Sequence, residues 1–450
     1  MSKITVAGAG VGGLIAAMKL AQAGHDVTVY EKNSAGDCGY EQKDSFDASA
    51  VEYAGIEIPG DFYAPGNEIT FFPIDEDVAP LKMPPPEGYK NITVDRKKLF
   101  SCLSSLAADA GVKFVYDTEV RAPVILGSRV CGIKTENETV YSDLIIDACG
   151  MNSPLRKALP EWMSIEKEAE SRDFLYAYRA IFDRKDGDFD TGERYKIYVH
   201  SDTGFTWIIT EDDCVDVLIV DFNEIPYSKV ADELHKVSVR NPQMGMNLIG
   251  NGKFMQIPVR QPLAVFVADG YAAVGDSAFM TYAVKGSGIA YSIKAGTILA
   301  RAVTEDTQGL YEAETLWNYE KDFFNEIGFD ACRIALIKNL FPYFTADEIN
   351  EIFSKKLVTS EEVEKLLTGG YRKSELPGLI KDKLKLLGDV PEFRSQLLML
   401  VGWLGKFALL DSFFPAKYTR EDAAKWSERY NRFFESTGNP ARREEQTEAE

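Results

Sequence analysis

The sequence predicts an α/β protein, α+β overall, with a doubly wound core, an inserted and mostly antiparallel β-sheet, and a helical C-terminal region. Three observations support this. Residues 3–31 read as strand, glycine turn, helix and strand. Residues 164–262 alternate apolar and polar positions as sheet strands do, and the chain after residue 304 has a helical pattern rich in aromatic residues.

The expected domains follow from changes in this pattern along the chain. A stretch rich in proline and glycine interrupts the α/β core, which predicts an excursion of the chain into the sheet domain. With 450 residues, 45% of them hydrophobic, the chain can bury cores for roughly two or three domains. The predicted boundaries are 1–60, 90–163 and 263–304 for the core, 61–89 and 164–262 for the sheet domain, 305–440 for the helical region and 441–450 for a disordered tail.

The charge and the cysteines of the chain indicate which binding partners and which cellular compartment to expect. The chain carries 50 basic and 70 acidic residues, a formal charge of −20 that repels nucleic acids and anionic membranes in general. The six cysteines are scattered and form no zinc-type grouping with the three histidines, so we expect reduced thiols and no metal site. A first strand near Ile4 leaves no room for a secretory signal. We therefore expect a cytoplasmic protein with no nucleic-acid partner.

The most apolar run of the chain, Leu397 to Leu410, is shorter than the roughly 20 residues that a membrane-spanning helix needs. We expect it to form a buried core helix. The alternative is a helix that lies in a membrane interface, which would make the protein peripheral to the membrane.

The glycine turn near the N-terminus carries the strongest local signal. The segment Gly8-Ala9-Gly10-Val11-Gly12-Gly13 fits G-x-G-x-x-G, in which Gly8 makes the tight turn, Gly10 lets the backbone approach a pyrophosphate and Gly13 packs helix against strand. Glu31 ends the second strand, where a carboxylate accepts hydrogen bonds from ribose hydroxyls. Together, the glycine turn and Glu31 predict a Rossmann-type dinucleotide site. The negative charge of Glu31 argues against NADP as the dinucleotide.

Two later segments extend this signal. Residues 147–156 read D-A-C-G-M-N-S-P-L-R and residues 269–278 read D-G-Y-A-A-V-G-D-S-A. With the glycine turn, they resemble the FAD superfamily that includes para-hydroxybenzoate hydroxylase, flavin halogenases and geranylgeranyl reductases. The resemblance implies bound FAD, with Gly275 and Asp276 at the ribityl chain.

The resemblance also implies the remaining cofactor contacts. Gly286-Ser287-Gly288-Ile289 opens a helix, so its backbone amides would face the pyrimidine edge of the flavin. Arg96 stands where the family has an arginine near the cofactor, although a surface arginine at a helix start is an equal alternative. Val120 completes the expected cofactor-binding set.

Details within the motifs separate the branches of the superfamily. Cys149 stands where aromatic hydroxylases usually have an aspartate, which disfavours that branch. The run 286–296 is similar to the G-E-G-I-x-x-A-x-x-x-G of geranylgeranyl reductases, and residues 204–209 resemble their Y-x-W-x-F-P element. The family's prolines are replaced by Thr210 and Ala283. The similarity is good over residues 1–300 and only generic beyond.

The leading hypothesis is an FAD-dependent oxidoreductase that reduces C=C bonds of an apolar, prenyl-like substrate by hydride transfer through flavin N5. The electron donor would be NAD(P)H or a ferredoxin-like protein. Cys38 matches the active-site cysteine of the reductases, and Cys38 and Tyr282 are the candidate proton donors. For Cys38 the alternative is a small buried hydrophobic residue.

Two other functions remain open on the same fold. One is a flavin-dependent monooxygenase or halogenase, which the cysteine at position 149 disfavours. The other is a non-enzymatic lipid-binding protein, against which the retained Glu31 and Asp276 argue. We expect the substrate beneath the sheet domain, and the aromatic face formed by Phe174, Tyr176, Tyr178 and Phe182 is either its wall or ordinary sheet packing.

Overall fold

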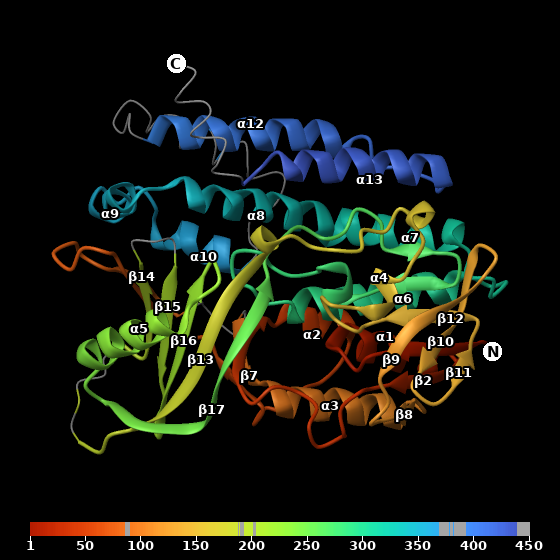
Figure 1. Cartoon of the computed structure of the whole chain (residues 1–450), viewed down its shortest axis with the longest axis horizontal. Helices are drawn as coiled ribbons and strands as arrows, with labels where there is room; N and C mark the ends of the chain where they lie inside the picture. Colours follow the sequence, from red (N-terminus) through yellow and green to blue (C-terminus); the bar gives the residue numbers. More distant parts are fainter. Residues whose placement is uncertain are drawn as a thin grey trace.

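The computed structural model describes residues 1–85, 91–187, 189, 193–200, 204–368, 378, 381 and 393–438. The predicted tail at 441–450 lies outside the described residues. Figure 1 shows three regions: a Rossmann-like core, a long curved sheet beside it, and a layer of C-terminal helices above both. The predicted fold class is confirmed.

The core sheet has six strands in the order β18-β19-β12-β1-β2-β8, all parallel except the β18–β19 pair. The strands from β18 to β1 are almost entirely buried, as expected for a parallel sheet covered on both faces, whereas the edge strand β8 has no buried residue. Their bounds are β1 Lys3–Ala7, β2 Asp26–Tyr30, β8 Lys113–Val115, β12 Leu144–Asp147, β18 Val267–Ala268 and β19 Tyr271–Ala273. Two three-stranded sheets flank it: β3 Lys43–Asp47, β7 Asn91–Asp95 and β4 Tyr63–Pro65, and β11 Thr139–Tyr141, β10 Arg129–Thr135 and β9 Val120–Leu126.

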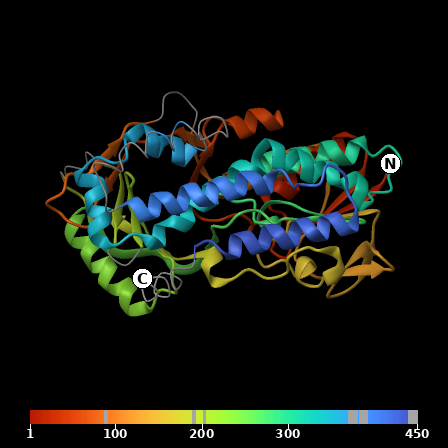
Figure 2. The same cartoon turned by 90° about the horizontal axis from the view of Figure 1, so that it is seen from above.

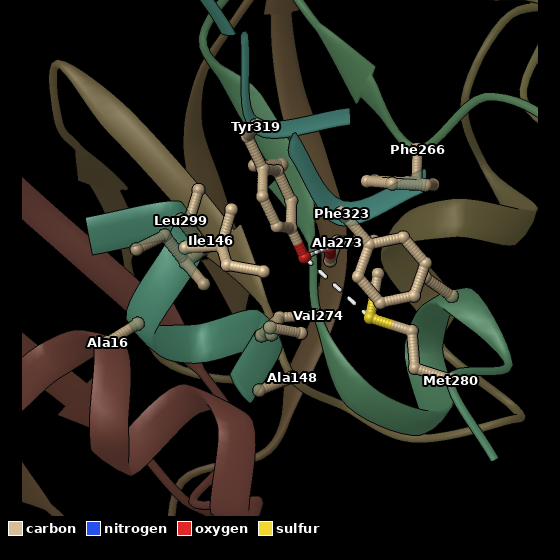
Figure 3. Close-up of a cluster of buried hydrophobic side chains, with 14 of the residues drawn as sticks. Ala16, Ile146, Ala148, Phe266, Ala273, Val274, Met280, Leu299, Tyr319 and Phe323 are labelled. Carbon is tan, nitrogen blue, oxygen red and sulfur yellow. Dashed lines mark hydrogen bonds between the residues drawn. The ribbon is translucent and has the colours of Figure 1, made fainter. Parts of the chain in front are cut away.

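Two helices that begin at glycine motifs pack closely on this sheet. A Cβ on Gly296 of α6 (Ile289–Glu305) would lie 2.4 Å from the Gly12 carbonyl oxygen of α1 (Val11–Gln22), so only glycine permits this approach. Figure 3 shows Ala16 of α1 and Leu299 of α6 in the buried cluster beside the sheet. The close contact of α1 and α6 brings their N-terminal turns to the same side of the core.

The second domain is a seven-stranded sheet in the order β17-β13-β16-β15-β14-β5-β6. Only the β14–β5 pair is parallel, and the first two strands in sequence come from the proline-rich excursion. The bounds are β5 Ile69–Phe72, β6 Leu81–Met83, β13 Phe174–Arg184, β14 Tyr195–Val199, β15 Phe205–Thr210, β16 Cys214–Asp221 and β17 Met244–Pro258.

The two faces of this sheet have different partners. Tyr178 packs with Val217 and Ile219 in the cluster that contains Val230 and Val237 of α5 (Tyr227–Arg240). Tyr176 and Phe182 pack at the edge of the same cluster. Phe174, at the start of β13, instead packs on Phe279, with their ring centroids 6.4 Å apart. The aromatic side of β13 is therefore packed against α5 and the core, and the opposite face of the sheet lines the cavity described below.

The C-terminal helices share an aromatic core. Their bounds, with the earlier short helices, are α2 Ser49–Ala54, α3 Arg96–Asp109, α4 Pro154–Lys157, α7 Ala313–Phe323, α8 Phe329–Leu340, α9 Ala346–Ser354, α10 Ser360–Thr368, α12 Arg394–Asp411 and α13 Arg420–Glu435. Phe324, in the π-helical turn after α7, lies 5.1 Å from Phe414 and 6.0 Å from Trp426, centroid to centroid. Figure 3 shows Tyr319 of α7 directing its hydroxyl toward Ala273 of the core sheet, a hydrogen bond of 3.0 Å.

The apolar run at 397–410 forms most of α12, which lies lengthwise over the molecule with α13 in Figure 2. Trp403 and Phe407 are buried, whereas Leu398 and Leu409 are exposed, so the helix is half buried rather than wholly in the core. Among the residues that the structure describes, every helix is too short or too polar to cross a membrane.

Candidate functional site

A cavity of about 2040 Å³ lies where the core, the long sheet and the C-terminal helices meet. The glycine loop lines one part of it. The free face of the long sheet lines another, with Leu175, Ile197 and Leu218, and the helical region contributes Phe344 and Ile352. Ordinary ligand pockets enclose about 300–1,000 Å³. The cavity therefore has room for a dinucleotide and a second, largely apolar ligand.

The glycine loop of β1 and α1 forms an anion site on the cavity wall. Gly8 has φ +89°, and a Cβ there would lie 2.5 Å from the Ala148 carbonyl oxygen. Gly10 is the N-cap of α1 and no side chain caps the helix. The first-turn amides are therefore available to a ligand, and the helix dipole favours a negative charge at this point. A Cβ on Gly13 would lie 2.6 Å from the Ala148 Cβ, so this glycine permits close packing of α1. The binding of a pyrophosphate at Gly8 and Gly10 stays a prediction.

Glu31 is fixed beside this loop. Its Oε2 accepts a hydrogen bond from the Ala9 amide at 2.8 Å, and its Oε1 accepts one from the Asn33 amide at 2.9 Å. The carboxylate lines the cavity next to the anion site, where ribose hydroxyls of a dinucleotide would donate to it. Val120 lies buried at the start of β9 and is not part of the cavity wall.

The second and third motifs meet at Asp147, which has no exposed surface. Its Oδ2 accepts hydrogen bonds from the hydroxyls of Ser153 and Tyr271, the latter at 2.7 Å. Its Oδ1 accepts from the Ser277 hydroxyl and the Cys149 amide, both at 3.0 Å. The two segments that the sequence treated as separate motifs are thus held by one buried carboxylate.

Cys149 itself lies against the first strand. Its Sγ donates to the Ala7 carbonyl oxygen at 3.3 Å, and burial raises the pKa of the thiol well above its ordinary value. The thiol is therefore neutral, so this position supplies none of the charge that an aspartate would bring to the cavity.

Asp276 and Gly288 form the other polar part of the cavity wall. A Cβ on Gly288 would lie 2.9 Å from Asp276 Oδ1, and Gly288 is the uncapped N-cap of α6. Desolvation raises the pKa of Asp276, whereas the Arg96 charge opposes that rise. The Ser287 hydroxyl is buried without a hydrogen-bond partner in the described part of the chain. A ligand that donates hydrogen bonds to Asp276 and accepts them from the α6 amides would satisfy the hydrogen-bonding capacity of these groups.

Arg96 stands in the cavity wall at the start of α3. Its guanidinium lies 4.4 Å from the centroid of the Tyr40 ring, and Nη1 lies 3.5 Å from Asp44 Oδ2. Gly275 and Gly286 adopt φ +67° and +68°, and Ile289 begins α6 on the same wall. The structure thus brings Arg96, Gly275, Asp276, Gly286, Gly288 and Ile289 together.

The two candidate proton donors have different surroundings. Cys38 lines the cavity, and its Sγ donates to the Ser34 carbonyl oxygen at 3.2 Å. Burial, reinforced by Glu31 and nearby aspartates, raises the pKa of Cys38 to about 11. Tyr282 is buried with its ring 5.7 Å from that of Tyr291, and it is not part of the cavity wall. Of the two, only Cys38 faces the space where a ligand would lie.

Sequence reasoning missed two lysines in the cavity wall, Lys285 and Lys338. Desolvation lowers the pKa of each from 10.5 to about 8. Neither ammonium group makes a hydrogen bond or an ion pair with any described residue. Lys285 directly precedes Gly286, so the glycine motif could have drawn attention to it. Lys338 carries no sequence signal, because it reads as an ordinary lysine near a helix end.

The polar groups of the cavity fit a flavin dinucleotide. Two uncapped helix N-termini face it, one beside a ribose-type carboxylate and one beside Asp276. Both N-termini line one continuous cavity, so one extended ligand could contact both, with a pyrophosphate at one and a ring system at the other. In the described part of the chain, no three His, Cys, Asp or Glu side chains gather as metal ligands would.

Comparison with known proteins agrees with this geometry. A family described as an NAD(P)-binding Rossmann-like domain matches residues 6–55. The digeranylgeranylglycerophospholipid reductase of Sulfolobus acidocaldarius is 24% identical over 271 residues, which cover 57% of this chain and 59% of that protein. A probable electron transfer flavoprotein-quinone oxidoreductase of Escherichia coli is 23% identical over 432 residues, covering 84% of this chain and 97% of the relative.

Solved structures show the same fold. A geranylgeranyl bacteriochlorophyll reductase-like protein of Thermoplasma acidophilum superposes with a TM-score of 0.69 at 19% identity, covering 85% of this chain and 99% of that one. A flavin-dependent brominase superposes with a TM-score of 0.64 at 17% identity, covering 81% and 93%. These likenesses support the predicted architecture. The chain is thus similar in sequence to reductases of geranylgeranyl lipids, and its fold is that of a geranylgeranyl reductase-like protein and a flavin-dependent brominase.

Proposed function

We propose that the protein binds FAD along the polar part of the cavity and reduces C=C bonds of an apolar, prenyl-like substrate in the remainder. One observation carries this proposal: the nucleotide site and a long apolar space are parts of the same cavity. The reductase names of the relatives support the reaction class, and the size of the apolar part supports a long hydrocarbon ligand.

The chain would hold the cofactor through the groups described above. The α1 amides would bind the pyrophosphate, Glu31 the ribose, Asp276 the ribityl hydroxyls, and the α6 amides the pyrimidine edge. When bound, the flavin supplies hydride chemistry at N5. The protein's own part is to orient the substrate, to exclude water and to deliver a proton.

Cys38 is the proposed proton donor for the carbon that does not receive the hydride. Its raised pKa of about 11 means that Sγ keeps its proton at neutral pH, and it faces the cavity. Lys285 is the competing donor, and its pKa of about 8 lies lower. A pH–rate profile separates them, because activity would fall above pH 11 for Cys38 and above pH 8 for Lys285.

The decisive experiment uses protein loaded with FAD and photoreduced without oxygen. Addition of a geranylgeranyl lipid should restore the oxidised flavin spectrum and yield a product with two more hydrogen atoms for each double bond reduced. The fully saturated phytanyl lipid is the matched control and should leave the flavin reduced. Failure of every isoprenoid tried to reoxidise the flavin would contradict the proposal, as would a product that contains oxygen from O₂.

A further inference from the structure

Lys338 is a buried cation in the wall of the cavity. It lies in the last turn of α8 and is 5% exposed, and its ammonium group has neither a hydrogen bond nor an ion pair in the described part of the chain. Buried charges in proteins are normally paired, because removing an ammonium group from water is costly. An unpaired lysine in a ligand cavity therefore needs an explanation.

The neighbouring charged groups form no ion pair with Lys338. Asp173 is the carboxylate that favours the charged form of Lys338, but it already accepts from Arg260 at 3.1 Å. Arg260 also pairs with Glu166 at 2.6 Å, and both Arg260 and Arg172 oppose the charge on Lys338. Both carboxylates, Glu166 and Asp173, thus have Arg260 as their ion-pair partner, and neither forms an ion pair with Lys338.

The rest of the nearby wall is apolar. Phe341 and Phe344, which follow Lys338 along the chain, line the cavity with Leu175 and Ile257 of the long sheet. A ligand that fills this region would be mainly hydrocarbon, and its contact with Lys338 would be a single polar point. An anionic group there would receive a charge-assisted hydrogen bond in a site screened from water.

We propose that Lys338 binds the anionic group of an amphiphilic ligand whose hydrocarbon part lies along the apolar wall. This inference rests on the proposed function, since it places the ligand in the same cavity. It adds a specificity determinant: the protein would distinguish an anionic isoprenoid, such as a phosphate ester, from a neutral one with the same tail.

A purely structural role for Lys338 leads to a different expectation. A cation in the last turn of a helix interacts favourably with the helix dipole, and this would hold with no ligand present. In that case Lys338 would affect the stability of α8 but not the choice between two ligands that differ only in charge. Ligand preference is therefore the measurement that separates the two roles.

The test measures binding to oxidised, FAD-loaded protein by calorimetry, with no turnover. The probes are geranylgeranyl monophosphate, geranylgeraniol and inorganic phosphate alone, at pH 7.5. The wild type should bind the monophosphate about 10- to 100-fold more tightly than the alcohol. Lys338→Met should lose this preference while it still binds the alcohol, and Lys338→Arg should largely keep it. Lys406→Met, on the exposed side of α12 and outside the cavity wall, should behave as the wild type does.

The outcomes are distinct. An unchanged preference in Lys338→Met, or equal binding of both prenyl compounds by the wild type, would overturn this inference and leave the proposed function standing. Binding of neither prenyl compound would overturn the proposed function, and this inference with it. Inorganic phosphate that binds as tightly as the prenyl ester would assign Lys338 to a free anion and overturn the headgroup role. Retained flavin absorbance in both variants shows that a loss of preference is not a loss of fold.

Discussion

The charge on Lys338 should make the ligand-free protein less stable than a variant that lacks it. Its pKa is 10.5 in the unfolded chain and about 8 in the folded one. Below pH 8 both states carry the proton, so the folded state bears the full cost of burying the charge, about 3 kcal/mol at pH 7. Between pH 8 and 10.5 the folded state releases the proton first, and the wild type gains stability as the pH rises.

Lys338→Met should therefore be more stable than the wild type by up to about 3 kcal/mol at pH 7. The difference should shrink toward zero as the pH approaches 10.5. Urea unfolding of FAD-loaded protein between pH 6.5 and 9.5 measures it, with Lys406→Met as the exposed control expected to differ by less than about 0.5 kcal/mol. A variant that is less stable at pH 7, or a difference that does not change with pH, would refute the reasoning.

Four further outcomes test the site. Glu31→Ala should weaken FAD binding by about 1.5–3 kcal/mol, measured by flavin fluorescence titration, and Glu31→Gln should weaken it by a smaller amount. Equal affinity in the wild type and both variants would contradict the proposal that Glu31 binds the ribose. Gly288→Ala should displace Asp276, whose Oδ1 would lie 2.9 Å from the new Cβ, so preparations should lose their yellow colour. Cys38→Ala should abolish turnover with an unchanged flavin spectrum, whereas full turnover would remove Cys38 as the donor. Reduced protein mixed with oxygen in a stopped-flow instrument should show no long-lived flavin hydroperoxide, because Cys149 stands where the aromatic hydroxylases usually have an aspartate. For the same reason, the oxidised protein should consume little NADPH in a separate assay. A stable hydroperoxide would favour the monooxygenase branch.

The parts of the site that the sequence could predict are those formed locally. Gly8, Gly10 and Glu31 belong to one βαβ unit, so their spacing in the chain already determines their spacing in space. The same holds for Asp276 and Gly288, which lie on either side of a short loop. In the structure, Gly10, Glu31, Asp276 and Gly288 line the cavity, and Gly8 does not.

The parts that could not be predicted depend on contacts between distant segments. Lys338 of α8 lines the cavity and interacts electrostatically with Asp173, which directly precedes β13, and this arrangement has no local sequence signal. The sequence also could not predict what the aromatic side of β13 packs against. Alternation separates the two faces of a strand, but only the position of α5 decides which face meets a helix and which meets a ligand.

The buried carboxylate of Asp147 has a consequence for how the protein acquires its cofactor. Two of its four donors, Tyr271 and Ser277, come from a segment more than 120 residues later in the chain than Asp147 itself. A nascent chain that ends before Tyr271 contains the complete glycine loop and Glu31, yet it would leave Asp147 half satisfied inside a sheet without its neighbour β19. Flavin uptake during synthesis should thus wait until Tyr271 and Ser277 have been added to the chain, and fragments that end before Tyr271 should stay colourless.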